Sequence, residues 1–342
     1  MTIFNRGNNN RSIPSVVKIC IGDYFCKDDI IRLSDSYFDV IIDFLARVPS
    51  DIERIYPVLG NSCRQFIFIS TACVYRRAPM DFPLKENSPK PNRNWNYSIY
   101  KYECEEKLRW LNSSFSSYYT IVRPYITYND ERIPIGIAPA YRYHRTIIER
   151  IRCGKPMILW DDGKAITTVT HTLDFSKGVV GLFLNDRAKN ESFHITSNFQ
   201  YSGKDLLLEL YSVLGQKPNI ISVSTEELCE LMPQYASMLK GDRTLDAVFD
   251  NKKIVETVQH LSFKIDIKEG LRRILTYYDS LGRFEYDYEY DALMDRVALY
   301  CGIKTMYVKY PGMHNSQHLI YIIFKYFPYR VAKRLKRMLR WL

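Results

Sequence analysis

A short apolar run that ends in hydroxyl-bearing residues constrains the fold of this chain more than any other feature. Residues 66–69 read Phe-Ile-Phe-Ile and pass directly into Ser70 and Thr71. Aromatic and β-branched residues in such a run predict a buried strand of a parallel sheet. Open α/β sheets bind their ligands at the carboxyl ends of the strands. We therefore predict a parallel sheet in which this strand end presents Ser70 and Thr71 to a ligand.

A tyrosine and a lysine at helical spacing follow this strand. Residues 97–111 suit a helix, in which Tyr97 and Lys101 lie on one face. A free phenol has a pKa of about 10, and a nearby ammonium that favours phenolate makes it a working base near neutrality. The spacing also occurs at 300/304, 321/325 and 329/333, but only the first copy follows a strand that ends in hydroxyls. This pattern predicts proton transfer by Tyr97, with Thr71 or Ser70 holding the substrate oxygen.

Residues 68–75, Phe-Ile-Ser-Thr-Ala-Cys-Val-Tyr, followed by Tyr97-x-x-x-Lys101, resemble the active-site segment of the extended short-chain dehydrogenase/reductases. This group holds the NAD-dependent sugar-nucleotide epimerases and dehydratases, and the resemblance extends to about Ser280. It implies an α/β fold with a Rossmann-like, doubly wound parallel sheet and a smaller α/β substrate domain. It also implies NAD(P)-dependent epimerisation or reduction of a nucleotide-linked sugar. Thr71, Tyr97 and Lys101 would be catalytic, and Lys101 would lower the pKa of Tyr97 and hold the nicotinamide ribose.

The resemblance also assigns residues that bind the cofactor and the substrate. Arg6 stands at a strand end where relatives usually carry an acid for the ribose; an arginine there can pair with a 2′-phosphate, which favours NADP over NAD. The implied cofactor-binding residues are Asn5, Arg6, Asp23, Tyr24, Phe44, Leu45, Ala46, Ser70, Pro124 and Tyr125. The implied substrate-binding residues are Arg76, Thr127 and Arg145. Core packing or a solvated side chain is the alternative at these positions.

The Gly-rich turn that holds the dinucleotide pyrophosphate in such folds does not precede the first predicted strand, residues 1–7. The sheet is therefore predicted to be incomplete at its N-terminal end, without its first βα unit, which leaves two strand edges unpaired. Either the native protein is longer, or the chain is a degenerate member with weak or no binding of NAD or NADP.

Three departures from the family pattern bear on the substrate. Relatives that dehydrate sugars carry Asp-Glu directly after the catalytic Thr, where this chain has Ala72-Cys73, so epimerisation is favoured over dehydration and simple ketone reduction stays open. Thr167 replaces an Arg that grips the nucleotide diphosphate in many epimerases, which weakens a UDP-sugar assignment. His171 is interpreted as a hydrogen-bonded structural residue.

The second half of the chain resembles most closely the branch that includes the chloroplast stem-loop RNA-binding proteins. A catalytically degenerate module that binds RNA, a membrane or a protein partner is therefore the alternative function. Nucleic acid is disfavoured by the charge distribution, because seven of the net +10 charges lie in residues 325–342. Eight cysteines without metal-ligand spacing and no secretory signal indicate a cytoplasmic protein without a structural metal.

The C-terminal region is predicted to be an appendage. We divide the chain into a dinucleotide-binding domain (1–125), a mainly substrate-binding domain (126–281) and an appendage (282–342), in which the acidic, aromatic residues 282–295 form a linker or an edge segment. Residues 319–324 are apolar but too short to span a bilayer. Beyond Pro328, the apolar residues Val331, Leu335, Met338 and Leu342 form one stripe of a basic helix. Such a helix suits an anionic membrane surface, on the inner face of the membrane; a helix docked on the domain or a homodimer contact is the alternative. An enzyme that processes precursors of envelope polysaccharide would benefit from this location.

Overall fold

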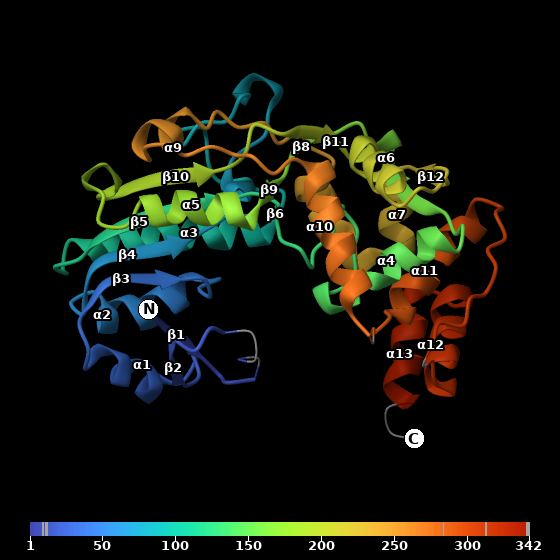
Figure 1. Ribbon diagram of the computed structural model, residues 1–342, viewed down its shortest axis with the longest axis horizontal. Helices are drawn as coiled ribbons and strands as arrows, with labels where there is room; N and C mark the ends of the chain where they lie inside the picture. The colour runs from blue at the N-terminus through green and yellow to red at the C-terminus, as the bar shows by residue number, and fades with distance from the viewer. Residues whose placement is uncertain (9, 11–12, 283, 312, 340–342) are drawn as a thin grey trace.

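The computed structural model describes residues 1–342 except 9, 11–12, 283, 312 and 340–342. A parallel sheet with flanking helices forms one half of the molecule, and a mostly helical half lies beside it (Figure 1). The strands are β1 (Thr2–Asn5), β2 (Lys18–Ile21), β3 (Phe38–Asp43), β4 (Cys63–Ile69), β5 (Tyr118–Pro124), β6 (Thr127–Tyr128), β7 (Met157–Trp160), β8 (Ile166–Thr168), β9 (Thr170–His171), β10 (Glu191–Ile195), β11 (Gln200–Ser202) and β12 (Ile220–Val223). The α-helices are α1 (Lys27–Ser34), α2 (Pro49–Leu59), α3 (Asn96–Asn112), α4 (Arg145–Arg152), α5 (Thr172–Gly181), α6 (Gly203–Val213), α7 (Thr225–Leu231), α8 (Ala236–Met238), α9 (Lys252–Thr257), α10 (Ile267–Ser280), α11 (Tyr288–Tyr300), α12 (Asn315–Tyr326) and α13 (Tyr329–Leu339).

The central sheet is parallel, with strand order β10-β5-β4-β3. Successive residues of β4 point to opposite faces, as the pleat requires. Phe66 and Phe68 pack in one apolar cluster with residues of α1, α2 and α3, whereas Ile67 and Ile69 pack in another with residues of α5 and α9. Helices therefore cover both faces of the sheet, and the predicted Rossmann-like, doubly wound architecture is confirmed.

The predicted gap in the sheet is also present. Within the described residues β1 pairs only with β2, and β3 pairs only with β4, so that the N-terminal strands form a separate parallel pair. This pair shares a core with the main sheet, because Phe4 packs in the same cluster as Ile41. The Tyr24 hydroxyl donates to Asp43 Oδ2 at 2.9 Å, which ties the end of the pair to the end of β3.

The helical half has its own large core and three short two-stranded ladders, β11-β8, β12-β7 and β6-β9. The expectation that residues 282–295 form a linker is wrong, because Asp291 and Asp295 lie on α11 with both side chains buried. Their carboxylates form ion pairs with Arg150 and Lys155. Spacing i to i+4 puts the two acids on one face of the helix, and that face is turned inward.

The last two helices pack on this core rather than standing apart from it. Tyr321, Phe324 and Ala332 are buried, and Leu335 packs against the same core. The docked-helix alternative therefore describes the inner face of α13, while Val331 and Met338 stay exposed and Leu342 lies outside the described residues. None of the described helices has the length and apolarity needed to cross a bilayer.

Candidate active site

Thr71 and Tyr97 are brought together at the carboxyl end of β4, as predicted. Thr71 caps the short 3₁₀ helix η1 (Ala72–Val74), and its Oγ1 accepts a hydrogen bond from the Cys73 amide at 3.2 Å. Tyr97 lies in the first turn of α3, with its ring 4.8 Å from that of Trp95. The Thr71 side chain lies close enough to the Tyr97 phenol to act on it, and it lowers the phenol pKa. The two hydroxyls are therefore neighbours, at a place where a substrate oxygen could bind.

The Tyr97 phenol is a weak acid in this structure. Burial of the hydroxyl end raises its pKa to about 12, although 37% of the residue surface is exposed. Cys73 and Asp242 add to the increase, whereas Thr71 and the positive charge of Arg47 oppose it. The phenol is therefore protonated near neutrality, and it could act as a base only if a bound ligand lowered its pKa.

Lys101 is placed differently from the prediction. Its ammonium donates to the backbone carbonyls of Ala46 at 2.8 Å and Ile69 at 2.7 Å, so it joins the loop after β3 to the end of β4. Only 4% of the residue surface is exposed, and burial lowers the Lys101 pKa to about 8. Arg47, which the sequence reading did not single out, is the cation that acts on the Tyr97 phenol. The expected role of Lys101 toward Tyr97 is therefore not what this geometry shows.

The predicted cofactor residues divide into open and closed positions. Phe44 and Leu45 are exposed at the carboxyl end of β3, and Arg6 is exposed at the end of β1. Asn5 Oδ1 accepts the Gly7 amide at 2.7 Å, and Asp23 Oδ1 accepts the Phe25 amide at 2.9 Å. The first three are open to a ligand, whereas Asn5 and Asp23 shape their own turns.

Four other cofactor predictions fall on side chains that the core occupies. Tyr24 donates to Asp43, the Ala46 side chain is fully buried, and the Ser70 hydroxyl donates to Glu105 Oε1 at 2.6 Å. Tyr125 donates to Asp242 Oδ1 at 3.3 Å from a buried position. We therefore assign structural roles to these side chains: Ala46 is buried, and each of the three polar groups already has a protein partner. Pro124 ends β5 and pairs with Ile195 in the sheet.

Two of the three predicted substrate residues are also corrected. Arg76 is exposed and forms a two-pronged ion pair with Asp81, with both N–O distances 3.0 Å. Arg145 pairs with Glu149 at 2.7 Å and Asp279 at 3.3 Å. Both guanidinium groups already have carboxylate partners in the protein. Thr127 lies at the start of β6, and its carbonyl accepts from Arg132 Nη1 at 2.5 Å.

A buried cluster beside Cys73 is the main feature that the sequence reading missed. Arg77 forms an ion pair with Asp242 and donates to the Tyr125 hydroxyl at 3.2 Å. Arg243 Nη1 lies 2.9 Å from Asp242 Oδ2. Burial raises the pKa of Asp242, but the two arginines more than offset this and the pKa is lowered. Within the described residues the Nε atoms of both arginines are buried without a hydrogen-bond partner.

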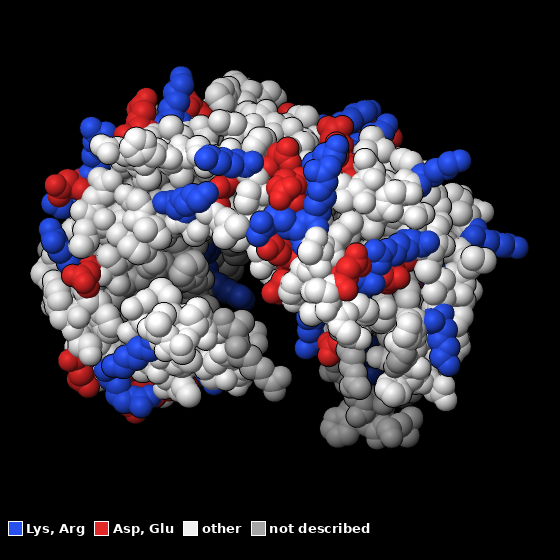
Figure 2. Space-filling model, viewed as in Figure 1, with Lys and Arg blue, Asp and Glu red and all other residues white. Residues whose placement is uncertain are grey.

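Two arginines thus share one buried carboxylate beside Cys73. The adjacent arginines Arg76 and Arg77 are the sequence feature that points to this cluster. Nothing in the sequence shows which of the two side chains is buried. A third arginine, Arg132, is close enough to Arg243 for their charges to interact. Figure 2 shows a hollow between the two halves of the molecule with a basic side chain inside it. The interior at this junction is positive.

His171 has the structural role that the sequence predicts. Its Nε2 lies 3.1 Å from Asp130 Oδ1, and its Nδ1 accepts the Leu173 amide at 3.3 Å. Both ring nitrogens are therefore engaged in holding the turn that starts α5.

Residues 57–196 match the profile of the NAD dependent epimerase/dehydratase family. This segment belongs to that family. It contains Thr71, Tyr97 and Lys101, together with β4, α3 and β5. The predicted resemblance to this family is therefore confirmed for residues 57–196, the part of the chain that the profile covers.

Individual relatives agree with this family assignment. The chain is 24% identical over 197 residues to the chloroplast stem-loop binding protein of 41 kDa b of Arabidopsis thaliana, which is 57% of this chain and 48% of that protein. It thus spans about half the length of that relative. The structure is similar to an epimerase of Methanothermobacter thermautotrophicus, with a TM-score of 0.65 and 12% identity over 81% of this chain and 84% of the other. It is also similar to a UDP-glucuronic acid 4-epimerase of Bacillus cereus, solved with UDP-glucuronic acid and NAD, with a TM-score of 0.59 and 18% identity over 78% and 83% of the two chains. The structural matches establish the epimerase fold.

Proposed function

We propose that this chain is an NAD(P)-dependent epimerase or reductase of a nucleotide-linked sugar, acting on precursors of a polysaccharide. The observation that carries the proposal is the position of Thr71 just after β4 and of Tyr97 in the first turn of α3, close enough for Thr71 to act on the phenol, inside the segment that matches the epimerase/dehydratase family. Such a pair can hold one substrate oxygen and exchange a proton with it while hydride moves at the same carbon.

The chain's own residues fit one end of the dinucleotide better than the other. A bound nicotinamide would supply the hydride chemistry, and the exposed Phe44 and Leu45 beside the Thr71–Tyr97 pair offer it an apolar wall. For the pyrophosphate, a helix N-terminus free of acids would be favourable. The first turn of α1 carries Asp28 and Asp29, and that of α2 carries Asp51. Among the described residues we therefore expect weak binding of the phosphates, with Arg6 as the exposed cation nearest the N-terminal strand end.

The roles of the site residues follow from their surroundings. Tyr97 would give a proton to the sugar oxygen or take one from it, and Thr71 would orient that oxygen. Arg47 would favour the phenolate, since its charge already lowers the Tyr97 pKa. Burial raises the pKa of the Cys73 thiol to about 12, so it stays neutral near pH 7 and cannot serve as a base. This supports epimerisation or ketone reduction over loss of water.

The positive junction supports an anionic substrate. Arg77 and Arg243 contribute two positive charges against the single negative charge of Asp242. Burying an uncompensated charge is costly unless a ligand of opposite sign completes it. A nucleotide sugar carries such charge on its diphosphate, and some sugars carry more.

Two measurements test the proposal. Fluorescence titration with NADH and with NADPH should show saturable binding, with NADPH favoured if Arg6 meets a 2′-phosphate. Turnover of UDP-glucuronic acid, UDP-glucose and related nucleotide sugars should fall by about 10²- to 10⁴-fold in Tyr97→Phe, which is the usual contribution of a general acid–base. Tyr100→Phe is the matched control, because this exposed tyrosine lies on the same helix. Absence of binding of either cofactor at millimolar concentration would overturn the enzyme reading.

A non-catalytic function is the second candidate, and the position of Lys101 favours it. Its ammonium is held by two backbone carbonyls, and Arg47 is the cation that lowers the Tyr97 pKa. A degenerate member would keep the scaffold and bind RNA or a protein, and the relative from Arabidopsis thaliana is named for stem-loop binding. Gel shift with a stem-loop RNA separates the two candidates, since the enzyme reading predicts no saturable shift at physiological salt. A cytoplasmic location and a homodimer remain proposals.

A further inference from the structure

The outer face of α13 carries charge that the rest of the protein does not neutralise. Arg330, Lys333, Arg334 and Arg337 are all exposed, and none forms an ion pair with a described residue. Lys336, on the inner side of the same helix, is paired with Glu289 at 2.6 Å. The spacing of the four exposed cations, i, i+3, i+4 and i+7, places them on one face of the helix.

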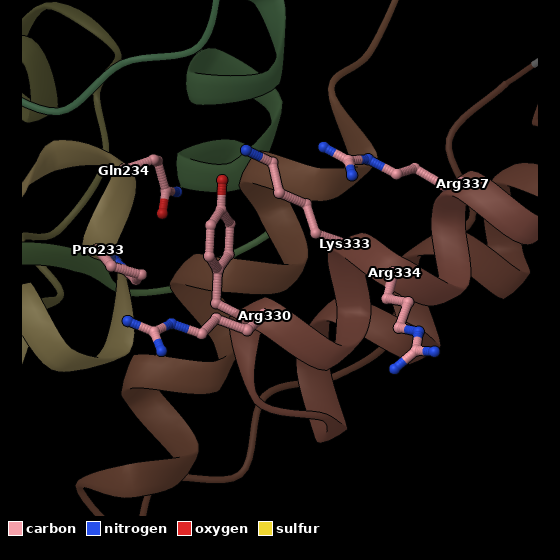
Figure 3. Close-up of a pocket in the computed structure, with 7 residues that line it drawn as sticks. Pro233, Gln234, Arg330, Lys333, Arg334 and Arg337 are labelled. Carbon is pink, nitrogen blue, oxygen red and sulfur yellow. The ribbon is translucent and has the colours of Figure 1, made fainter.

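A groove runs along this basic face. It has a volume of about 560 Å³ and lies between α13 and the short 3₁₀ helix η6 (Pro233–Tyr235). Figure 3 shows Arg330, Lys333 and Arg337 extending toward the side of Pro233 and Gln234, with Arg334 pointing away from them. The lining contains no acid: it consists of Pro233, Gln234, Tyr329, Arg330, Lys333, Arg334 and Arg337. The groove therefore suits a phosphate-bearing group.

An exposed apolar edge lies directly beside the basic face. Val331 is 43% exposed and Met338 is 60% exposed, and the seven-residue spacing puts them on one side of the helix next to Arg334. Phe327, which precedes the helix, is also exposed. An exposed apolar edge gains nothing from a free polyphosphate or an RNA backbone, whereas it gains from entering the interface of a bilayer.

We propose that α13 seats this protein on an anionic lipid bilayer, with the phosphate headgroups against Arg330, Arg334 and Arg337 and with Val331 and Met338 entering the interface. The helix stays docked on the protein through Ala332 and Leu335, so binding requires no unfolding of the C-terminal region. This proposal does not depend on the catalytic assignment, because α13 shares no residue with the site at Thr71 and Tyr97.

The decisive measurement is sedimentation of the full chain with vesicles. Wild-type protein should sediment with phosphatidylcholine vesicles that contain phosphatidylserine and stay in solution with phosphatidylcholine alone. Each cation near an anionic surface contributes about fivefold to the partition constant, so Arg330→Gln/Arg334→Gln should lower it by about 25-fold at low salt. The matched control is Lys204→Gln/Lys217→Gln, which removes two exposed lysines without ion pairs to described residues and should leave the partition constant unchanged.

Further measurements distinguish binding to a bilayer from binding to other anions. Val331→Ser/Met338→Ser should weaken vesicle binding at high salt, where the charge contribution is screened. The same variant should leave any binding to inorganic phosphate or to a stem-loop RNA unchanged. Unfolding midpoints equal to wild type show that both variants are folded. The proposal would be overturned if wild-type protein failed to sediment with the anionic vesicles, or if Arg330→Gln/Arg334→Gln lost RNA binding but kept vesicle binding.

Discussion

Two buried groups of cations, one inside the helical half and one at the junction of the two halves, are compensated by carboxylates to different degrees. In the helical half, Arg150 and Lys155 share two carboxylates: Arg150 Nη1 lies 2.7 Å from Asp291, and Lys155 Nζ lies 2.6 Å from Asp291 and 2.8 Å from Asp295. A further cation, Lys325, approaches Asp295 only at 3.9 Å and is held by the hydroxyls of Tyr321 and Thr305.

The group around Asp242, at the junction of the two halves, has fewer carboxylates for its cations. Arg77 and Arg243 share Asp242 alone, and Lys101 is held only by backbone carbonyls. The ion pairs of Arg150 and Lys155 with Asp291 and Asp295 join α4 to α11 and stabilise the fold. The group around Asp242 leaves positive charge beside Thr71 and Tyr97, where an anionic ligand would complete it. The difference indicates which buried charges stabilise the protein and which are kept for binding.

The largest effect on stability should come from the first group. Asp291→Ala leaves Arg150 and Lys155 with one carboxylate between them, and loss of one partner of a buried ion pair costs about 3–5 kcal/mol. Urea unfolding at neutral pH measures this free energy. Asp279→Ala is the control, since that acid is exposed, its partner Arg152 is partly exposed, and its buried partner Arg145 keeps Glu149; pairs with an exposed acid contribute little. Equal destabilisation by both substitutions would contradict a structural role for the buried group.

The lone ammonium of Lys101 should show itself in the pH dependence of stability. Burial lowers its pKa from the ordinary value of 10.5 to about 8 in the folded protein. Between these two values the unfolded chain binds more protons, so the free energy of unfolding should increase as pH rises, by on the order of 3 kcal/mol across the window. Lys101→Met should remove this increase, as seen in urea unfolding from pH 7.5 to pH 10. A slope that persists in the variant would assign the effect to another group.

The sequence predicts the strands, the family and the Thr71–Tyr97 pair because these depend on local patterns. An apolar run predicts β4, and the helical spacing after it predicts α3. The sequence does not reveal the partners of Arg77, because Asp242 lies 165 positions away along the chain. It also misses the role of residues 287–295. Their acidic and aromatic composition is typical of a linker, but Asp291 and Asp295 lie on the buried face of α11.

The excess positive charge around Asp242 should affect ligand affinity more than stability. Arg243→Gln leaves Arg77 paired with Asp242 and removes one charge, so the free energy of unfolding should change less than in Asp291→Ala. A hydrogen bond to a charged group contributes about 1.5–3 kcal/mol, which corresponds to a 10- to 100-fold weaker Kd for a nucleotide sugar such as UDP-glucuronic acid. Calorimetric titration measures the Kd. Lys240 is an exposed lysine of the same short π-helix (Leu239–Arg243), so Lys240→Gln is the control and should bind as wild type does.

The smallest effect is expected at Arg76, although it is the direct neighbour of Arg77 and has the same side chain. Its guanidinium faces solvent and pairs with Asp81, whereas that of Arg77 is fully buried against Asp242. Arg76→Ala should therefore leave both the unfolding midpoint and the Kd for the nucleotide sugar at wild-type values. Arg77→Met, measured in the same two assays, should lower the midpoint, because Asp242 then has only Arg243 to compensate it, and should weaken binding. A clear loss of affinity in Arg76→Ala would mean that ligand binding draws this side chain away from Asp81, and the substrate position first predicted for Arg76 would be restored.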